Sequence, residues 1–165
     1  MTKRQSLREN KQTLVITNGC FDLLHAGHLY FLNHAARLGD TLWVLLNSDS
    51  SVHSLKGPSR PVQSEQERAY ALASLEAVQS VIIFYQKRLT KEIRLLQPDI
   101  YVKAGDYSLA TLDKEELVAF KTVNSTIRFL PFLEGFSTTS FLDKIRCATL
   151  AKRRKSVDTN NLSNV

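Results

Sequence analysis

The chain has 165 residues, of which 43% are hydrophobic, and its formal net charge is +6. This length suits one folded domain, and no apolar run is long enough to span a bilayer. The polar first twelve residues lack the apolar middle of a secretory signal, so we expect a cytoplasmic protein that binds no membrane. Two cysteines, Cys20 and Cys147, give neither a disulfide framework nor a zinc-binding spacing.

Strand-like and helix-like segments alternate in the first half of the chain. Residues 13–17 are rich in β-formers, and residues 26–38 carry apolar side chains at helical spacing before Gly39, a predicted helix C-cap. Residues 41–46 form a continuous apolar run, which is typical of a strand buried on both faces of a parallel sheet. Residues 47–61 are polar and contain glycine and proline, which predicts a loop.

The second half continues the alternation. Ser64 and Glu67 have the spacing of a capping box, which predicts a helix that runs to about residue 75. Further strands are predicted at residues 81–85, 100–102 and 126–130, and helices at residues 90–97, at 112–121 and from 137–139 to about 150. We expect a folded domain of residues 11–150, with flexible termini at 1–10 and 151–165.

This order of elements predicts an α/β protein. Right-handed crossovers would build a Rossmann-like three-layer α/β/α sandwich around a five-stranded, mostly parallel sheet. Ligands of such sheets bind outside the carboxyl ends of the strands. The segments that follow the strands should therefore converge, namely residues 18–28, 47–60, 103–107 and 134–139.

The first of these segments reads N-G-C-F-D-L-L-H-A-G-H and contains two of the four histidines. The free N–H groups of the following helix suit a phosphate, and Gly27 would let a ligand approach the backbone. His25 and His28 flank Gly27 and would each donate a hydrogen bond to a phosphate oxygen. Two other readings stay open, a metal site and simple capping of the helix.

The other segments carry cations and hydroxyl groups. Lys56 and Arg60 flank Gly57 and two prolines, as in a semi-rigid grip for an anion, although ordinary loop charge is an alternative. Periodicity does not decide whether Arg68 points toward the same anion or toward solvent. Lys103 and Asp106 follow a strand, and the hydroxyl-rich start of the last helix would hold a triphosphate or merely cap that helix.

Neither a P-loop nor a G-x-G-x-x-G motif occurs in the sequence, and we find no catalytic triad or paired-carboxylate site. The pattern favours positioning and charge neutralisation, which nucleotidyl and phosphoryl transfer require.

Several ordered motifs carry a resemblance to a known family. G-C-F-D-L-L-H-A-G-H at residues 19–28 resembles the H-x-G-H signature of the cytidylyltransferase-like nucleotidyltransferases. The likeness spans residues 12–146 and continues through L-G-D at 38–40, N-S-D at 47–49, L-K-G-x-x-R-P-V at 55–62, E-R at 67–68, V-K-x-G-D-Y at 102–107 and E-G-x-S-T-T at 134–139. It is strongest toward the members that make ADP-heptose.

The resemblance implies transfer of AMP from ATP to D-glycero-β-D-manno-heptose 1-phosphate, which yields ADP-heptose and pyrophosphate for lipopolysaccharide biosynthesis. It also implies Mg²⁺ that arrives with ATP, no dedicated metal ligands, and a homodimer. One alternative is a cytidylyltransferase that acts on glycerol 3-phosphate or another small phosphorylated alcohol. A second alternative is a non-catalytic nucleotide-binding regulatory module, in which the basic residues 151–155 contact nucleic acid; we expect no nucleic acid as partner and interpret this cluster as a solvated end.

The resemblance also assigns roles to residues. His25 and His28 would steady the charge on the reacting phosphates, and Lys56 and Arg68 would hold the acceptor and nucleotide phosphates; these four are the expected catalytic residues. The expected nucleotide-binding residues are Gly19, Phe21, Asp22, Gly27, Asn47, Asp49, Lys103, Gly105, Asp106, Ser137, Thr138 and Thr139.

Overall fold

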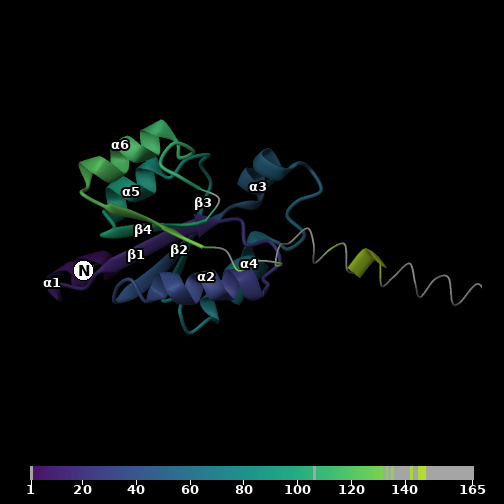
Figure 1. The fold of residues 1–165 in the computed structure, drawn as a ribbon, viewed down its shortest axis with the longest axis horizontal. Coiled ribbons are helices and arrows are strands. Elements are labelled where there is room, and N and C mark those ends of the chain that lie inside the picture. The colour runs from purple at the N-terminus through teal and green to yellow at the C-terminus, as the bar shows by residue number, and fades with distance from the viewer. Residues whose placement is uncertain are drawn as a thin grey trace, which may run out of the picture.

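Five parallel strands form the centre of the protein, in the spatial order β3-β2-β1-β4-β5 (Figure 1). The computed structural model describes residues 2–105, 107–131, 133, 135, 142 and 145–147. Strand β1 pairs with β2 on one side and with β4 on the other, so the chain changes direction across the sheet at β1. The strands are β1 (Leu14–Gly19), β2 (Thr41–Asn47), β3 (Ser80–Phe84), β4 (Ile100–Ala104) and β5 (Thr126–Leu130).

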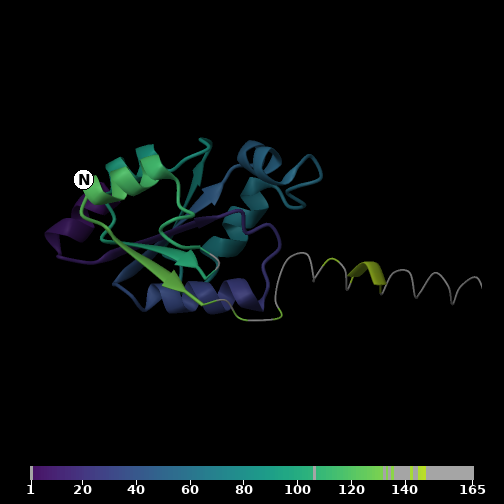
Figure 2. The ribbon, with the colours of Figure 1, turned by 45° about the horizontal axis from the view of Figure 1, so that its top comes forward.

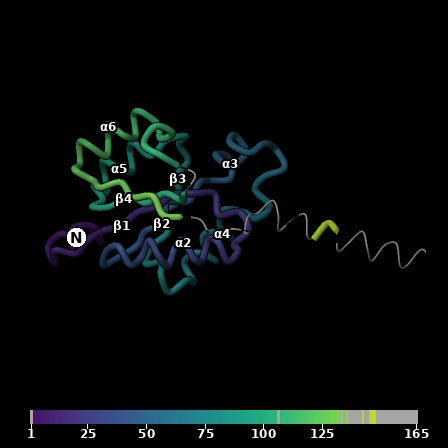
Figure 3. The backbone as a smooth tube through the Cα atoms, viewed as in Figure 1, coloured from purple at the N-terminus to yellow at the C-terminus, as the bar shows by residue number. Residues whose placement is uncertain are grey.

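Helices cover both faces of the sheet. Figure 1 and Figure 2 show α2 and α4 on one face and α5 and α6 on the other. At the two ends of the sheet lie α1 and α3, as the backbone trace in Figure 3 also shows. The helices are α1 (Lys3–Glu9), α2 (Ala26–Ala36), α3 (Asp49–Lys56), α4 (Glu65–Ala73), α5 (Thr90–Leu96) and α6 (Lys114–Thr122). The predicted three-layer α/β/α sandwich with five strands is confirmed.

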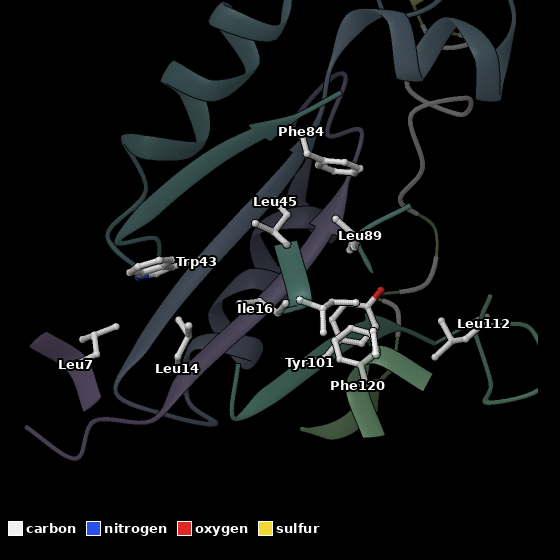
Figure 4. Packing of buried hydrophobic residues seen from close by; sticks show 12 residues of the cluster. Leu7, Leu14, Ile16, Trp43, Leu45, Phe84, Leu89, Tyr101, Leu112 and Phe120 are labelled. Carbon is white, nitrogen blue, oxygen red and sulfur yellow. The ribbon is translucent and has the colours of Figure 1, made fainter. Parts of the chain in front are cut away.

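The continuous apolar run of β2 is explained by burial on both faces. Trp43 and Leu45 belong to a hydrophobic cluster with α5 and α6, whereas Val44 belongs to the opposite cluster with α2 and α4. Figure 4 shows the first cluster, in which the Tyr101 and Phe120 rings stack with centroids 4.2 Å apart. Successive strand side chains point to opposite faces, so both layers of helices are held by the same strands.

Every strand and helix predicted up to β5 is present, with ends that shift by at most two residues. The capping box is also present: Ser64 Oγ accepts from the Glu67 amide, and the Glu67 carboxylate accepts from the Ser64 amide. No helix within the described residues is long and apolar enough to cross a bilayer. The predicted last helix and residues 151–165 lie mainly or wholly outside the described residues.

Two helices were not predicted. Within residues 1–10, which the sequence assigns to a flexible terminus, the structure has α1, which starts with a capping box at Thr2 and Gln5 and buries Leu7. Its Arg4 donates to the carbonyl oxygens of Leu96 and Gln97, which fastens α1 to the end of α5. Residues 47–61 were expected to be a loop, but they contain α3.

Helix α3 was missed because its sequence, D-S-S-V-H-S-L-K, is mostly polar and buries only Ser51 and Val52. Ser48 caps it by accepting from the Ser51 amide, and Asp49 lies in its positively polarised first turn. Capping rather than hydrophobic periodicity therefore marks this helix.

Gly39 is not the C-cap of α2, because the cap residue is Arg37. A Cβ atom at Gly39 would lie 2.7 Å from Val15 Cγ2 and 2.9 Å from the Thr13 carbonyl oxygen. The glycine is therefore required by the close packing of the connection before β2 against the start of β1.

We predict that Gly39→Ala lowers the free energy of unfolding by about 1–3 kcal/mol, because the added methyl group overlaps backbone and core atoms. Urea unfolding followed by circular dichroism measures this loss. Arg37→Ala, at an exposed neighbour, is the control and should change stability by less than about 0.5 kcal/mol. Equal stability of Gly39→Ala and the wild type would show that the connection relaxes without cost.

Candidate functional site

A cavity of about 620 Å³ opens at the carboxyl edge of the sheet, where β1, β2 and β4 end. This is the position that the topology predicts, beside the strand at which the chain changes direction. Its walls come from the loop after β1, the start of α2, the end of α3, the β3–α5 loop and the start of α6. The lining residues are Thr17, Asn18, Gly19, Cys20, Phe21, Asp22, Gly27, His28, Phe31, Asn47, Leu55, Lys56, Lys87, Arg88, Lys103, Ala104, Tyr107, Thr111, Leu112, Asp113 and Glu116.

The two histidines form a stacked pair at the N-terminus of α2. Their ring centroids are 3.8 Å apart, and the His28 ring also lies 5.2 Å from the Phe21 ring. His25 occupies the N-cap position, but its side chain makes no capping hydrogen bond. The Nδ1 atoms of both rings are buried without a hydrogen-bond partner among the described residues. A capping hydrogen bond therefore does not explain the His25 side chain. His28 lines the cavity, whereas His25 is not among the lining residues and contacts the cavity wall through His28.

Both imidazoles favour the neutral form. Burial lowers the pKa of His28 to about 4, and the charges of His25 and Lys56 add to this effect, while a hydrogen bond with the Leu23 backbone opposes it. Burial also lowers the pKa of His25. At neutral pH the imidazoles thus add no charge, and an anion bound beside them would favour their protonation.

Asp22 holds the segment that leads into α4. Its carboxylate, which is 2% exposed, accepts from Arg60 at 2.7 Å and from the backbone amides of Val62 and Gln63. Burial alone would raise the pKa of Asp22, but these hydrogen bonds outweigh it, so the pKa lies below the usual value. Asp22, an expected nucleotide-binding residue, lines the cavity, and its carboxylate is engaged by Arg60 and these two amides.

Arg68 is completely buried and connects three segments around the cavity. Its guanidinium donates to the Cys20 carbonyl oxygen at 2.5 Å, to the Gln63 carbonyl oxygen at 3.1 Å and to Asp49 Oδ1 at 2.7 Å. Arg68 is not among the lining residues, so its observed contacts position the walls rather than a ligand.

Asp49 and Asn47, both expected to bind nucleotide, lie at the end of β2. Asp49 is engaged with Arg68 through its side chain and donates its backbone N–H to Glu65 at 2.8 Å. Asn47 lines the cavity and donates its side-chain amide to Ser51 at 2.9 Å. Asn47 therefore lines the cavity, whereas Asp49 does not line it and instead contacts Arg68 and Glu65.

Three expected residues between the end of β1 and the start of α2 line the cavity. Gly19 leaves little room for a side chain, because a Cβ atom there would lie 3.0 Å from the Phe21 ring. Phe21 has a positive φ of 43°, an uncommon conformation for a bulky residue, and it is buried. Gly27 is buried at the start of α2 and lines the cavity, as its expected close approach to a ligand requires.

Lysines approach the cavity from two sides. Lys56 is the last residue of α3, and Lys103 lies near the end of β4. Lys103 donates to the Asn18 carbonyl oxygen at 3.4 Å, and its Nζ lies 4.6 Å from the centre of the Tyr107 ring. Asn18 is fixed from the core as well, because the buried Tyr101 hydroxyl donates to its Oδ1 at 2.8 Å.

The remaining expected residues lie away from the lining or outside the described chain. Gly105 follows β4 in an exposed turn and does not line the cavity. Four predicted nucleotide-binding residues lie outside the described residues, namely Asp106, Ser137, Thr138 and Thr139.

Sequence reasoning missed the wall that faces α5 and α6. Lys87, Arg88, Tyr107 and Glu116 line this part of the cavity. Lys87 and Arg88 lie three and four residues after the end of β3, so the convergence of the ends of parallel strands is the signal that could have found them. Burial raises the pKa of Glu116, whose carboxylate accepts from the Leu89 amide at 2.8 Å.

Metal ligands were not expected here. Among the described residues, no group of three or more His, Cys, Asp or Glu side chains could hold a metal ion. The carboxylate of Asp22 is occupied by Arg60, and that of Asp113 by Arg88 and the α6 amides.

Most of the chain resembles known proteins. The family model described as cytidylyltransferase-like matches residues 16–154. The Bifunctional protein HldE of Syntrophotalea carbinolica is 45% identical over 138 residues, which cover 84% of this chain and 28% of that protein. The Bifunctional protein HldE of Campylobacter jejuni is 46% identical over 140 residues, covering 85% and 29%. The chain spans less than a third of the length of these relatives.

Solved structures show the same fold. The lipopolysaccharide core biosynthesis protein from Thermoplasma volcanium superposes with a TM-score of 0.61 at 26% identity, over 74% of this chain and 97% of that one. The pantoate-beta-alanine ligase from Francisella tularensis superposes with a TM-score of 0.50 at 16% identity, over 78% of this chain and 63% of that one. The second likeness concerns the fold alone.

We predict that Arg68→Met lowers the free energy of unfolding by about 2–4 kcal/mol, because two partly buried carbonyl oxygens and the Asp49 carboxylate lose their donor. Urea unfolding at pH 7 measures the loss. Arg94→Met, at an exposed position of α5, should change stability by less than about 0.5 kcal/mol. If both variants were equally stable, the Arg68 contacts would contribute nothing to the fold.

We also predict that the His28 ring of the free protein titrates with a midpoint near pH 4, because burial opposes its protonation. NMR of the ring protons, assigned with His28→Gln, measures this midpoint, and a bound triphosphate should raise it. The folded protein binds this proton more weakly than the unfolded chain, so His28 should lower stability as the pH falls below 6.5. A midpoint near 6.5 in the free protein would contradict the burial.

Proposed function

Because the chain belongs to the cytidylyltransferase-like family, we propose that it is a nucleotidyltransferase that transfers AMP from ATP to D-glycero-β-D-manno-heptose 1-phosphate. The products are ADP-heptose and pyrophosphate. The observation that carries the proposal is the stacked pair of His25 and His28 at the N-terminus of α2, with His28 lining a cavity that lysines also line. This combination suits a polyphosphate.

The reaction is an in-line displacement at the α-phosphorus of ATP. An oxygen of the acceptor phosphate forms the new P–O bond, while the bond to the bridging oxygen breaks and its electron pair leaves with pyrophosphate. Charge grows on the phosphoryl oxygens and on the leaving group during this step. His28 and the free N–H groups of α2 donate hydrogen bonds to these oxygens, and His25 supports His28 by stacking.

The lysines supply the positive charge that the neutral imidazoles lack. Lys56 binds phosphate from the end of α3, and Lys103 binds the nucleotide from the end of β4. Mg²⁺ enters with ATP and offsets charge on the triphosphate oxygens. Arg68 and Asp22 are positioning residues, because they hold the surrounding loops. In this proposal the nucleotide is also bound by Asp106, Ser137, Thr138 and Thr139.

The choice of acceptor rests on similarity rather than on geometry. The relatives in bacteria are named Bifunctional protein HldE, and the solved structure from Thermoplasma volcanium is named for lipopolysaccharide core biosynthesis. Together with the ordered motifs, these likenesses support a sugar 1-phosphate acceptor. We further propose that the enzyme works as a homodimer in the cytoplasm, where ATP is available; light scattering measures the oligomeric state.

The proposal predicts pyrophosphate release when the protein is incubated with ATP, Mg²⁺ and the heptose 1-phosphate. CTP in place of ATP, and glycerol 3-phosphate in place of the sugar phosphate, should give far slower release. His28→Ala should lower kcat by about a hundredfold, the scale of one lost donor to the transition state. His53→Ala, on the exposed side of α3, is the matched control and should keep full activity.

Three outcomes would count against the proposal. Release with CTP and glycerol 3-phosphate alone would replace it with a cytidylyltransferase. Nucleotide binding without turnover on any acceptor would indicate a regulatory module. Full activity of His28→Ala would remove the histidine pair from the chemistry.

A further inference from the structure

The β3–α5 loop brings two adjacent cations, Lys87 and Arg88, to the wall of the cavity. Sequence reasoning gave neither residue a role. The two side chains have different surroundings, and the difference indicates what each one does.

Arg88 is committed to the protein. Its Nε lies 2.9 Å from Asp113 Oδ2, and its Nη1 lies 2.6 Å from Glu115 Oε1. Both carboxylates belong to the start of α6, so Arg88 ties the β3–α5 loop to that helix. The guanidinium is neutralised where it lies and is a poor partner for an additional anion.

The residue after Arg88 fixes the same loop. The Leu89 amide donates to Glu116 Oε1 at 2.8 Å, and the Leu89 side chain is fully buried in the cluster between the sheet and α5 and α6. Lys87 therefore extends from a backbone that is held on its C-terminal side by hydrogen bonds, ion pairs and packing.

Lys87 differs from the other cavity cations in its contacts. Within the residues that the structure describes, its ammonium group has no hydrogen-bond or ion-pair partner, although it lines the cavity. Lys103, in contrast, contacts the Asn18 carbonyl oxygen and the Tyr107 ring. An exposed lysine is often merely solvated, but a lysine at a cavity on an anchored loop is placed to bind an anion.

The order of the strands separates Lys87 from the expected nucleotide contact at Lys103. Strand β1, whose loop leads to His28, has β2 and β3 on one side and β4 on the other. Lys56 and Lys87 come from the connections after β2 and β3, whereas Lys103 comes from β4. In-line transfer requires the attacking group and pyrophosphate on opposite sides of the reacting phosphorus. The expected nucleotide contact, Lys103, lies on the β4 side, so the opposite side, with Lys56 and Lys87, is left for the acceptor phosphate.

We propose that Lys87 binds the phosphate of the acceptor together with Lys56, and so selects acceptors that carry a phosphate monoester. This inference rests on the proposed nucleotidyl transfer and assigns a residue to its second substrate. Arg88 is a positioning residue that keeps Lys87 at the cavity wall.

The test compares three variants of the full chain in the pyrophosphate assay. Lys87→Ala should raise KM for the heptose 1-phosphate by about tenfold or more, the scale of one lost charged hydrogen bond, and leave KM for ATP within twofold of the wild type. Lys87→Arg should recover most of the affinity, since it restores the charge. Lys91→Ala removes one positive charge four residues away on exposed α5 and should leave both constants unchanged.

A binding titration of the heptose 1-phosphate, with a non-hydrolysable ATP analogue present, tests the role of Lys87 separately from the proposed nucleotidyl transfer. Tight binding by the wild type and weaker binding by Lys87→Ala support the assignment. Equal binding by both proteins, or a rise in KM for ATP alone, would overturn the role of Lys87 while leaving the proposed function intact. Absence of both turnover and binding in the wild type would overturn the proposed function, and the assignment of Lys87 with it.

Discussion

The geometry of the cavity depends on one buried guanidinium. Arg68 has no exposed surface, and its hydrogen bonds reach the loop after β1, the segment before α4 and the start of α3. A charge buried this deeply is stable only when its partners stay in place. The same contacts therefore hold the folded state together and set the distance between the histidine loop and the helix that carries Lys56. The buried carboxylate of Asp22 likewise fixes the segment before α4, by accepting from the Val62 and Gln63 amides.

Different residues supply the neutral hydrogen-bond donors and the positive charge of the cavity. The imidazoles of His25 and His28 are buried enough to stay neutral, so like charges do not crowd the N-terminus of α2 before a ligand arrives. Positive charge comes from lysines on flexible stems around the rim. A polyphosphate would thus meet fixed, uncharged donors at its reacting centre and adjustable cations around it, which limits the cost of holding the empty site together.

Hydrophobic pattern predicted the sheet and most helices, because each strand buries apolar side chains on one or both faces. It failed for α1 and α3, whose sequences are mostly polar and whose ends are defined by capping at Thr2 and Ser48. The sequence motifs pointed to His28, Asn47 and Lys56, and all three line one cavity. They could not reveal that Arg68 is engaged by backbone carbonyl groups, because such partners leave no trace in side-chain spacing. Lys87 was overlooked because a lysine after a strand resembles ordinary surface charge until the cavity is seen.

The buried hydroxyl of Tyr101 has an effect beyond the core. Burial raises its pKa well above the usual value, so the hydroxyl keeps its proton and donates it to Asn18 Oδ1 at any physiological pH. Asn18 lines the cavity, and with its Oδ1 occupied by the tyrosine the amide has its NH₂ group left as a donor. Tyr101, which is not among the lining residues, thus restrains the orientation of an amide at the cavity wall, and replacing it with phenylalanine would remove that restraint.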